Sequence, residues 1–352
     1  MPIARAETFT RQHIEAHRFN APAVLAEQAV HCLELVAELV AAGLVFQFKG
    51  GNSLLLILQD PQRFSIDVDI ATDEPRERIE ACIDACVGNS GVFTKWEKRR
   101  HKTKPWLPIA SYYLFYNSQF GVAAADCSIM LDAQLRRSPY ATEFKPVRCL
   151  ELFQSDVRCD LPLPASIIGD KLLTLGPTTL GIPVGKGKAA QRLKHVFDIA
   201  TLITTNPSIS GVRGSFLACI RHEEEIQQRT IPVADVLRDT LDFCASTARY
   251  AEKPRPAPDM PPVLVENING LDEFRDHLFS KDYSWQRLHR DLARVALCIA
   301  AVCKQQVTDA EFLAALAGTA KPAQPFVIGA GVMKTDAQAR YCWEMVNGWG
   351  TP

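Results

Sequence analysis

A pair of glycines between two apolar runs, followed by two aspartates one residue apart, is the feature that most constrains this chain. The stretch reads FQFKGGNSLLLILQDPQRFSIDVDIATDE, from Phe46 to Glu74. Glycine pairs usually mark tight turns, and carboxylates usually avoid strands. Both rules give way where a backbone approaches a phosphate and where acidic side chains hold a metal ion. We therefore interpret the stretch as a strand, a glycine turn, a helix and a second strand around an anionic ligand.

The two aspartates are predicted metal ligands. Asp67 and Asp69 occupy positions i and i+2 of the strand SIDVDIAT, so both carboxylates should project from one sheet face. Two adjacent anions in a half-buried strand repel each other and lose hydration, and a divalent cation relieves both penalties. Mg²⁺ (or Mn²⁺) bridged to the phosphates of a nucleoside triphosphate (NTP) is the expected occupant. Asp126, predicted on a third strand, would complete a two-metal site.

The glycine turn is a predicted nucleotide-binding element. Gly50 and Gly51 precede NSLLLILQD, a predicted helix with Asn52 and Ser53 at its N-cap. The N-terminal amides of that helix could receive a triphosphate. A lone GG pair is usually only a turn, and a lone DxD is often a strand edge meeting a turn. Their combination in one strand–turn–helix–strand unit is what points to a site.

The pattern of elements changes near residue 165. Before it, helical and strand-like runs alternate, which predicts an α+β core with a mixed sheet; after it, the apolar period is helical. EKPRPAPDMPP is Pro-rich and is predicted to be a linker or surface loop. We predict an α/β core with an N-terminal helix over 1–160, a helical segment completing the nucleotide site over 161–250, and a C-terminal helical region over 263–352.

Charge and composition exclude several classes of protein. The net charge is −1, so nucleic-acid binding would need a local basic patch. No run approaches the ~18 apolar residues of a membrane span, and the first twenty residues lack the apolar core of a signal peptide. The eleven cysteines contain no CxxC pair, and Cys82 and Cys86 are predicted to be buried thiols. This usage predicts a reducing, cytoplasmic location.

The glycine and aspartate motifs resemble those of a known family. FKGGNSL followed by RFSIDVDI is similar to the AbiEii/AbiGii-type toxin nucleotidyltransferases, within the polymerase-β-like superfamily. Arg63, Phe64 and Ser65 match the family pattern together with both aspartates, whereas Asn52 stands where threonine is commoner. The resemblance implies a polymerase-β-like core with a mixed sheet, followed by a mainly helical C-terminal half.

Two later segments extend the resemblance, which covers roughly residues 25 to 205. LPLPASIIGDKLLTL resembles a helix that carries an essential lysine, which assigns Lys171 to nucleotide binding and catalysis. RLKHVFDIATL resembles a later basic-and-acidic motif, in which Lys194 and Asp198 take the basic and second acidic positions. His195 replaces the usual first aspartate of that motif and is left without a role.

The resemblance implies roles for these residues. Asp67 and Asp69 would hold the metal on the triphosphate, and Asp126 would bind the second metal and act as base for, or orient, the attacking hydroxyl. Lys171 would neutralise phosphate charge. Asp198 would orient Lys171 or bind the sugar or base.

The implied function is a cytoplasmic, metal-dependent nucleotidyltransferase of the toxin type, paired with a separately encoded antitoxin. It would transfer a nucleoside monophosphate from an NTP to an acceptor hydroxyl and release pyrophosphate. An RNA, such as a tRNA 3′ end, is the implied acceptor; a protein side chain or a small molecule such as an aminoglycoside is the first alternative. A catalytically silent module that binds a nucleotide or a partner protein is the second.

A basic stretch offers a candidate RNA contact. TKWEKRRHKTKPW, which includes Lys95 to Lys104, concentrates lysine and arginine between two tryptophans. An RNA-gripping hairpin and a merely solvated, twisted hairpin both fit this pattern.

Overall fold

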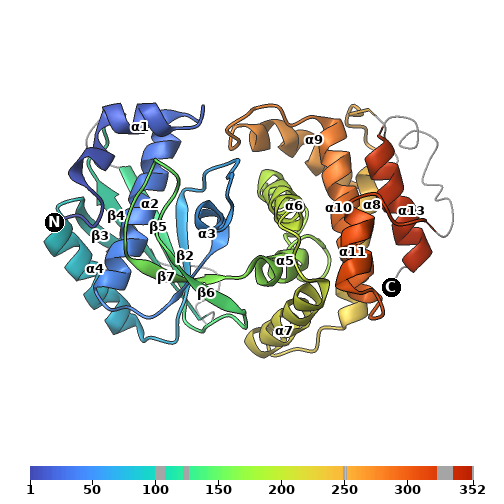
Figure 1. The fold of residues 1–352 in the computed structure, drawn as a ribbon, viewed down its shortest axis with the longest axis horizontal. Coiled ribbons are helices and arrows are strands. Elements are labelled where there is room, and N and C mark those ends of the chain that lie inside the picture. The colour runs from blue at the N-terminus through green and yellow to red at the C-terminus, as the bar shows by residue number, and fades with distance from the viewer. Residues whose placement is uncertain (100–107, 122–126, 249, 251, 323–335, 351–352) are drawn as a thin grey trace. The chain divides into compact units, whose positions relative to one another are not determined.

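The computed structural model describes residues 1–99, 108–121, 127–248, 250, 252–322 and 336–350. It divides the chain into two compact units, Met1–Leu163 with His277–Ser280 and Pro164–Asp276 with Lys281–Pro352 (Figure 1). Apart from residues 161–163 and His277–Ser280, the helical segments predicted separately, 161–250 and 263–352, lie within one unit. The short return segment His277–Ser280 belongs to the first unit because it forms a backbone bridge and a hydrogen bond beside Arg63.

The first unit is built on a seven-stranded mixed sheet, with strand order β3-β4-β5-β2-β1-β7-β6. Strand β2 pairs antiparallel with β1 and parallel with β5, so the strand with the two aspartates is central. The strands are β1 (Gln47–Lys49), β2 (Asp67–Ala71), β3 (Phe93–Lys98), β4 (Ile109–Tyr116), β5 (Cys127–Gln134), β6 (Thr142–Pro146) and β7 (Arg158–Pro162).

One face of the sheet is apolar. Val68 and Ile70 of β2 are buried with the alternate residues of β5 and β4, and α2 packs on β2, β5 and β7. The opposite face carries the polar positions of the same strands, because side chains alternate along a strand. The helices of this unit are η1 (Ala6–Phe9), α1 (Arg11–His17), α2 (Ala23–Ala41), α3 (Gly50–Ile57) and α4 (Arg76–Ser90).

The described part of the second unit is helical. Helix α10 packs on α6, α7, α8 and α13, which makes it the centre of this unit. No helix among the described residues is long and apolar enough to cross a membrane. The helices are α5 (Pro164–Leu173), α6 (Ala189–Ile203), α7 (Ile209–Gln227), α8 (Val233–Ala248), α9 (Pro262–Arg275), α10 (Trp285–Cys303), α11 (Asp309–Leu316) and α13 (Ala337–Trp349). The predicted α+β core with a mixed sheet and a helical C-terminal half is confirmed.

The structure differs from the sequence prediction at the glycine turn. Helix α3 begins at Gly50, with Lys49 as its N-cap, so both glycines lie inside the first turn. Asn52 and Ser53 are not the N-cap residues. The backbone can start the helix this early because Gly50 adopts a left-handed conformation, with φ of +74°.

The core of the first unit contains an acidic pair on α2. Glu34 accepts hydrogen bonds from the backbone N–H groups of Ile3 and Ala4. Burial, and then the neighbouring Glu34 carboxylate, raise the pKa of Glu38 from 4.5 to about 8. Glu38 is 6% exposed and one turn from Glu34 on the same helix. The Glu38 carboxyl group is therefore protonated in the folded protein at neutral pH.

We expect Glu38→Gln to remove one source of pH-dependent stability. Below pH 4.5 Glu38 is protonated in both the folded and unfolded states, so its protonated form carries no penalty there. As the pH rises from 4.5 to about 8 the unfolded chain loses this proton first, so wild-type stability falls. Thermal denaturation should show equal melting temperatures at pH 4.5 and a higher one for the variant at pH 8. A parallel pH dependence in both proteins would contradict the assignment.

Candidate functional site

The two aspartates of β2 lie on the polar face of the sheet. Asp67 and Asp69 are half-buried, whereas Val68 and Ile70 between and beyond them are buried in the core. In the register of the sheet, Asp69 faces Lys49 on β1 and Asp132 on β5. Cross-strand partners project from the same face, so a row of polar residues crosses the centre of the sheet.

Asp132 is a carboxylate that the sequence analysis missed. It is half-buried on β5, directly beside Asp69, and the Ser111 hydroxyl on β4 donates a hydrogen bond to its carboxylate. The predicted third carboxylate, Asp126, lies outside the described residues. In the run SIMLDAQ, apolar Ile129 and Leu131 alternate with Asp132, a pattern that indicates an acid on the polar face of a strand but not which strand it faces.

The glycine turn packs directly on these carboxylates. An added Cβ at Gly50 would lie 1.9 Å from Oδ2 of Asp69. An added Cβ at Gly51 would lie 2.8 Å from Oγ of Ser65 and 3.0 Å from Nη2 of Arg63. The residues of the RFSIDVDI stretch therefore form the surface against which the turn is folded, and only glycine fits at both positions.

We expect Gly50→Ala to damage the site far more than an equivalent change elsewhere. The matched control is Gly91→Ala, because Gly91 has nearly the same φ (+72° against +74°) but no atom within 4 Å of an added Cβ. Both variants should lose roughly 1–2 kcal/mol from the left-handed backbone. Only Gly50→Ala should also displace Asp69 and abolish nucleotidyl transfer, measured beside thermal unfolding. Equal activity in the two variants would show that Asp69 does not depend on the turn.

The side chains of Asn52 and Ser53 are fully buried and donate hydrogen bonds to backbone carbonyl oxygens. The Asn52 side-chain amide donates to the Asp67 carbonyl oxygen at 2.8 Å, and the Ser53 hydroxyl donates to the Gly50 carbonyl oxygen at 2.8 Å. The Asn52 side chain thus ties the turn to strand β2, the Ser53 side chain closes the turn itself, and both face away from solvent. Contacts to a ligand at this turn would come from backbone amides.

Lys49 adds a cation to the polar row. Its Nζ donates to Oε1 of Gln134 at 3.0 Å and to Oγ of Ser138 at 3.4 Å, and it lies 5.7 Å from the centre of the Tyr140 ring. The row therefore runs from Lys49 through Asp69 and Asp132, with positive and negative side chains side by side. Among the described residues, no group of three or more His, Cys, Asp or Glu side chains is arranged to hold a metal ion.

The second unit holds the predicted lysine in a buried ion pair. Nζ of Lys171 on α5 lies 3.0 Å from Oδ2 of Asp198 on α6, and the two side chains are 9% and 2% exposed. Lys194 is half-buried on α6. His195 on α6 contacts the residue that follows α5, because its Nδ1 lies 2.9 Å from Oγ1 of Thr174.

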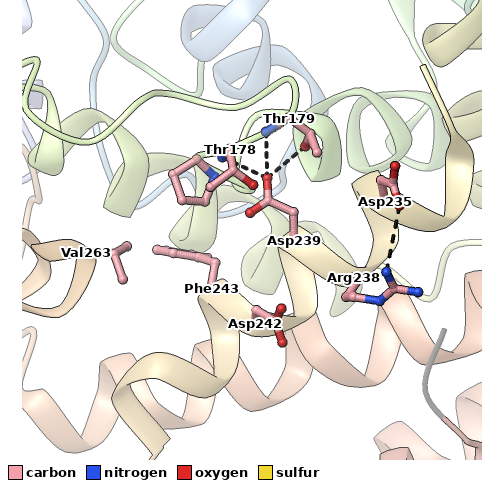
Figure 2. Close-up of a pocket in the computed structure, with 9 residues that line it drawn as sticks. Thr178, Thr179, Asp235, Arg238, Asp239, Asp242, Phe243 and Val263 are labelled. Atoms are coloured by element: carbon pink, nitrogen blue, oxygen red, sulfur yellow. Dashed lines mark hydrogen bonds and ion pairs between the residues drawn. The ribbon is translucent and has the colours of Figure 1, made fainter. Parts of the chain in front are cut away.

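A cavity of about 510 Å³ lies beside α8 in the second unit (Figure 2). Its central carboxylate, Asp239, accepts hydrogen bonds from the backbone N–H groups of Thr178 and Thr179 and from the Thr179 hydroxyl. Asp235 lies 3.8 Å from Arg238. The hydrogen bonds to Asp239 attach the loop between α5 and α6 to α8, and Asp235 lies near Arg238. These polar groups of the cavity are therefore engaged with one another and do not converge as a reactive set.

The basic stretch Lys95 to Lys104 is described only through Arg99. Nζ of Lys95 lies 2.9 Å from Glu97, and Nζ of Lys98 lies 2.8 Å from Glu80. A guanidinium nitrogen of Arg99 lies 2.9 Å from the Met130 sulfur. Residues 100–107 lie outside the described residues, so the RNA-gripping hairpin stays a prediction.

The comparisons with known proteins identify the family. Residues 34–282 match the family described as "Nucleotidyl transferase AbiEii toxin, Type IV TA system". A candidate nucleotidyltransferase from H. pylori is 13% identical, with a TM-score of 0.33 over 61% of this chain and 92% of that chain. JHP933 from Helicobacter pylori is 14% identical, with a TM-score of 0.31 over 61% and 89%. No curated protein matches.

The family match includes the glycine turn, the paired aspartates of β2, Asp132 and the Lys171–Asp198 pair. It spans residues 34–282 of 352, which is more than half of the chain. The motif resemblance and the match agree on the same stretch. The chain therefore belongs to the AbiEii family of nucleotidyltransferase toxins.

Proposed function

We propose that this chain is a metal-dependent nucleotidyltransferase that transfers a nucleoside monophosphate from an NTP to an acceptor hydroxyl. The acceptor oxygen would bond to the α-phosphorus, the bond from that phosphorus to the β-phosphate oxygen would break, and pyrophosphate would leave. The observation that carries the proposal is that Asp67 and Asp69 of β2 share a sheet face with Asp132, the β5 neighbour of Asp69, beside the glycine turn. These three side chains are called the carboxylate row below. An RNA, such as a tRNA 3′ end, is the proposed acceptor.

The donor set suits Mg²⁺ or Mn²⁺. Asp67 and Asp69 offer hard carboxylate oxygens on one face of β2, and Mg²⁺ is usually held by one or two carboxylates together with substrate phosphates and water. A cage of three protein ligands is therefore not required. When bound, the metal would neutralise the triphosphate and polarise the reacting phosphorus.

Other residues would handle charge and protons. Asp132, kept in place by the Ser111 hydroxyl, would accept the proton of the attacking hydroxyl or orient it. Asp126 remains a predicted alternative for that role. Lys171, with Asp198 fixing its ammonium group, would neutralise phosphate charge, and Lys194 would assist in nucleotide binding.

The family description supports a proposed partner, and the cysteines support a proposed place of action. Members are described as toxins of a type IV toxin–antitoxin system, so we propose a separately encoded antitoxin as the partner. The unpaired state of all eleven cysteines is compatible with action in the cytoplasm.

The test uses the purified protein, Mg²⁺ and each α-³²P-labelled NTP in turn, with total cellular RNA and lysate protein as acceptors. Label in a discrete RNA band is the expected result and would identify the preferred base. Label in protein would replace the proposed acceptor. Nucleotide binding without label in any acceptor would favour the catalytically silent module.

A further inference from the structure

An exposed aromatic ring lies on an edge strand of the sheet. Phe144 in β6 is 62% exposed, and β6 pairs only with β7 in the described sheet. Five other large hydrophobic side chains of the described residues are exposed, and none of them is aromatic. A phenyl ring held in water by a rigid strand costs solvation free energy, which a stacked ligand would recover.

The strand register places Phe144 on the same face as the carboxylate row. Phe144 pairs with Asp160 on β7, and Asp160 pairs with Gln47 on β1. Gln47 lies two residues before Lys49, which pairs with Asp69, and residues two apart share a face. Three strand spacings separate β6 from β2, which is about 14 Å. The ring is thus close to the carboxylates but too far to touch a group bound directly on them.

An arginine lies beside the ring on this face. Arg158 is exposed, pairs with Pro146 beside Phe144, and donates from Nη2 to the Phe144 carbonyl oxygen at 2.5 Å. Arg136 is also exposed, in the connection between β5 and β6. The buried Asp160 carboxylate is already paired with Arg137 at 2.6 Å.

Negative charge near the strand is likewise neutralised or turned away. Glu143 and Lys145 point to the opposite face of β6 and lie 2.9 Å apart. Towards the carboxylate row, the Tyr140 ring adjoins Lys49. Between Phe144 and Asp69 this face therefore carries Lys49 with the adjoining Tyr140 ring, while the Asp160 carboxylate is buried and paired.

We propose that Phe144 and Arg158 form a platform for the acceptor RNA, upstream of its 3′ end. The inference rests on the proposed function and adds a binding surface to it. A base a short distance before the reacting nucleotide stacks on the Phe144 ring, and Arg158 contacts the adjacent phosphate. Stacking on an exposed ring beside a guanidinium is the usual way in which single-stranded RNA is held, with little preference for sequence.

The test measures the affinity of the full chain for a short, fluorescein-labelled single-stranded RNA by anisotropy, without NTP. Phe144→Ala should weaken binding by about 5- to 150-fold, the range for one stacked base. Phe144→Tyr keeps an aromatic ring and should bind the RNA with an affinity close to that of the wild type. The matched control is Val24→Ala, because Val24 is exposed but lies on α2, which packs on the apolar face.

Salt dependence separates the two residues. Arg158→Ala should reduce the slope of log K against log salt by about 0.7, the value for one lost phosphate contact, whereas Phe144→Ala should leave it unchanged. Wild-type affinity in Phe144→Ala, or an equal loss in Val24→Ala, would overturn the platform. RNA affinity in Phe144→Tyr as low as in Phe144→Ala would also overturn the platform.

The binding measurement is independent of catalysis. A protein that binds RNA through Phe144 but transfers no nucleotide would retain the platform and overturn the proposed function. If the wild type labels RNA but Phe144→Ala binds RNA as tightly as the wild type, the proposed function would stand and the platform would be overturned. The KM for NTP should not change in Phe144→Ala, because the ring lies three strands from the carboxylates of β2.

Discussion

Asp69→Asn should abolish nucleotidyl transfer while the protein stays folded. Asp69 lies at the centre of the polar row, between Lys49 and Asp132, and its carboxylate packs against Gly50. Under the proposed function Asp69 would hold the metal, so removing its charge should cost roughly 4 kcal/mol of transition-state stabilisation, which is about a 10³-fold loss of rate. Asparagine keeps the size of the side chain, so the glycine turn keeps its packing.

The melting temperature of Asp69→Asn should not fall with its activity. Without bound metal, the carboxylates of Asp67, Asp69 and Asp132 repel one another across the row, so Asp69→Asn should hold or raise the melting temperature. Asp60→Asn is the control, since Asp60 is exposed and lies in the connection between α3 and β2. The assays are transfer of labelled NMP and thermal unfolding of the same preparations. Wild-type transfer in Asp69→Asn would exclude a catalytic role for the row.

Local pattern was enough to predict the strand and helices around the site. Alternation in SIDVDIAT separates Val68 and Ile70, which enter the core, from Asp67 and Asp69, which do not. This signal is local because side chains alternate along any strand. The helical period after residue 165 predicted a helical second half for the same reason.

The position of the third carboxylate could not be derived locally. Asp132 reaches Asp69 only through the parallel pairing of β2 with β5, and a shift of one residue would turn it to the other face. Asp126 and Asp132 have the same parity in the chain, so alternation alone does not choose between them. Register depends on packing between distant segments, which a single sequence does not reveal.

Strands β6 and β7 escaped prediction for a different reason. Strand β6 shows no burial alternation, and proline ends both strands, at Pro146 and Pro162. Proline is tolerated at a strand end or edge, but in sequence it argues against a strand. These two strands carry Phe144 and Arg158, so the proposed RNA platform became visible only in the structure.

Lys171→Met should both destabilise the protein and abolish transfer. The variant would remove the Lys171 ammonium group from the Asp198 carboxylate, which is 2% exposed. Breaking a buried ion pair by removing one partner costs about 3–5 kcal/mol, which would lower the melting temperature by roughly 6–20 °C. Lys281→Met is the control, because Lys281 and Asp276 form an exposed pair that should contribute at most about 1 kcal/mol.

The double variant Lys171→Met/Asp198→Val separates the structural role of the pair from its chemical one. Replacing both members of a buried ion pair by apolar residues is often neutral or stabilising, so the melting temperature should return close to that of the wild type. Transfer should stay abolished, because the ammonium group proposed to neutralise the phosphates is missing. If instead the double variant regained transfer together with stability, the pair would be a packing element and the phosphate-neutralising cation would have to be another residue. Because stability and activity are read from the same protein, a loss of folding cannot be mistaken for a loss of chemistry.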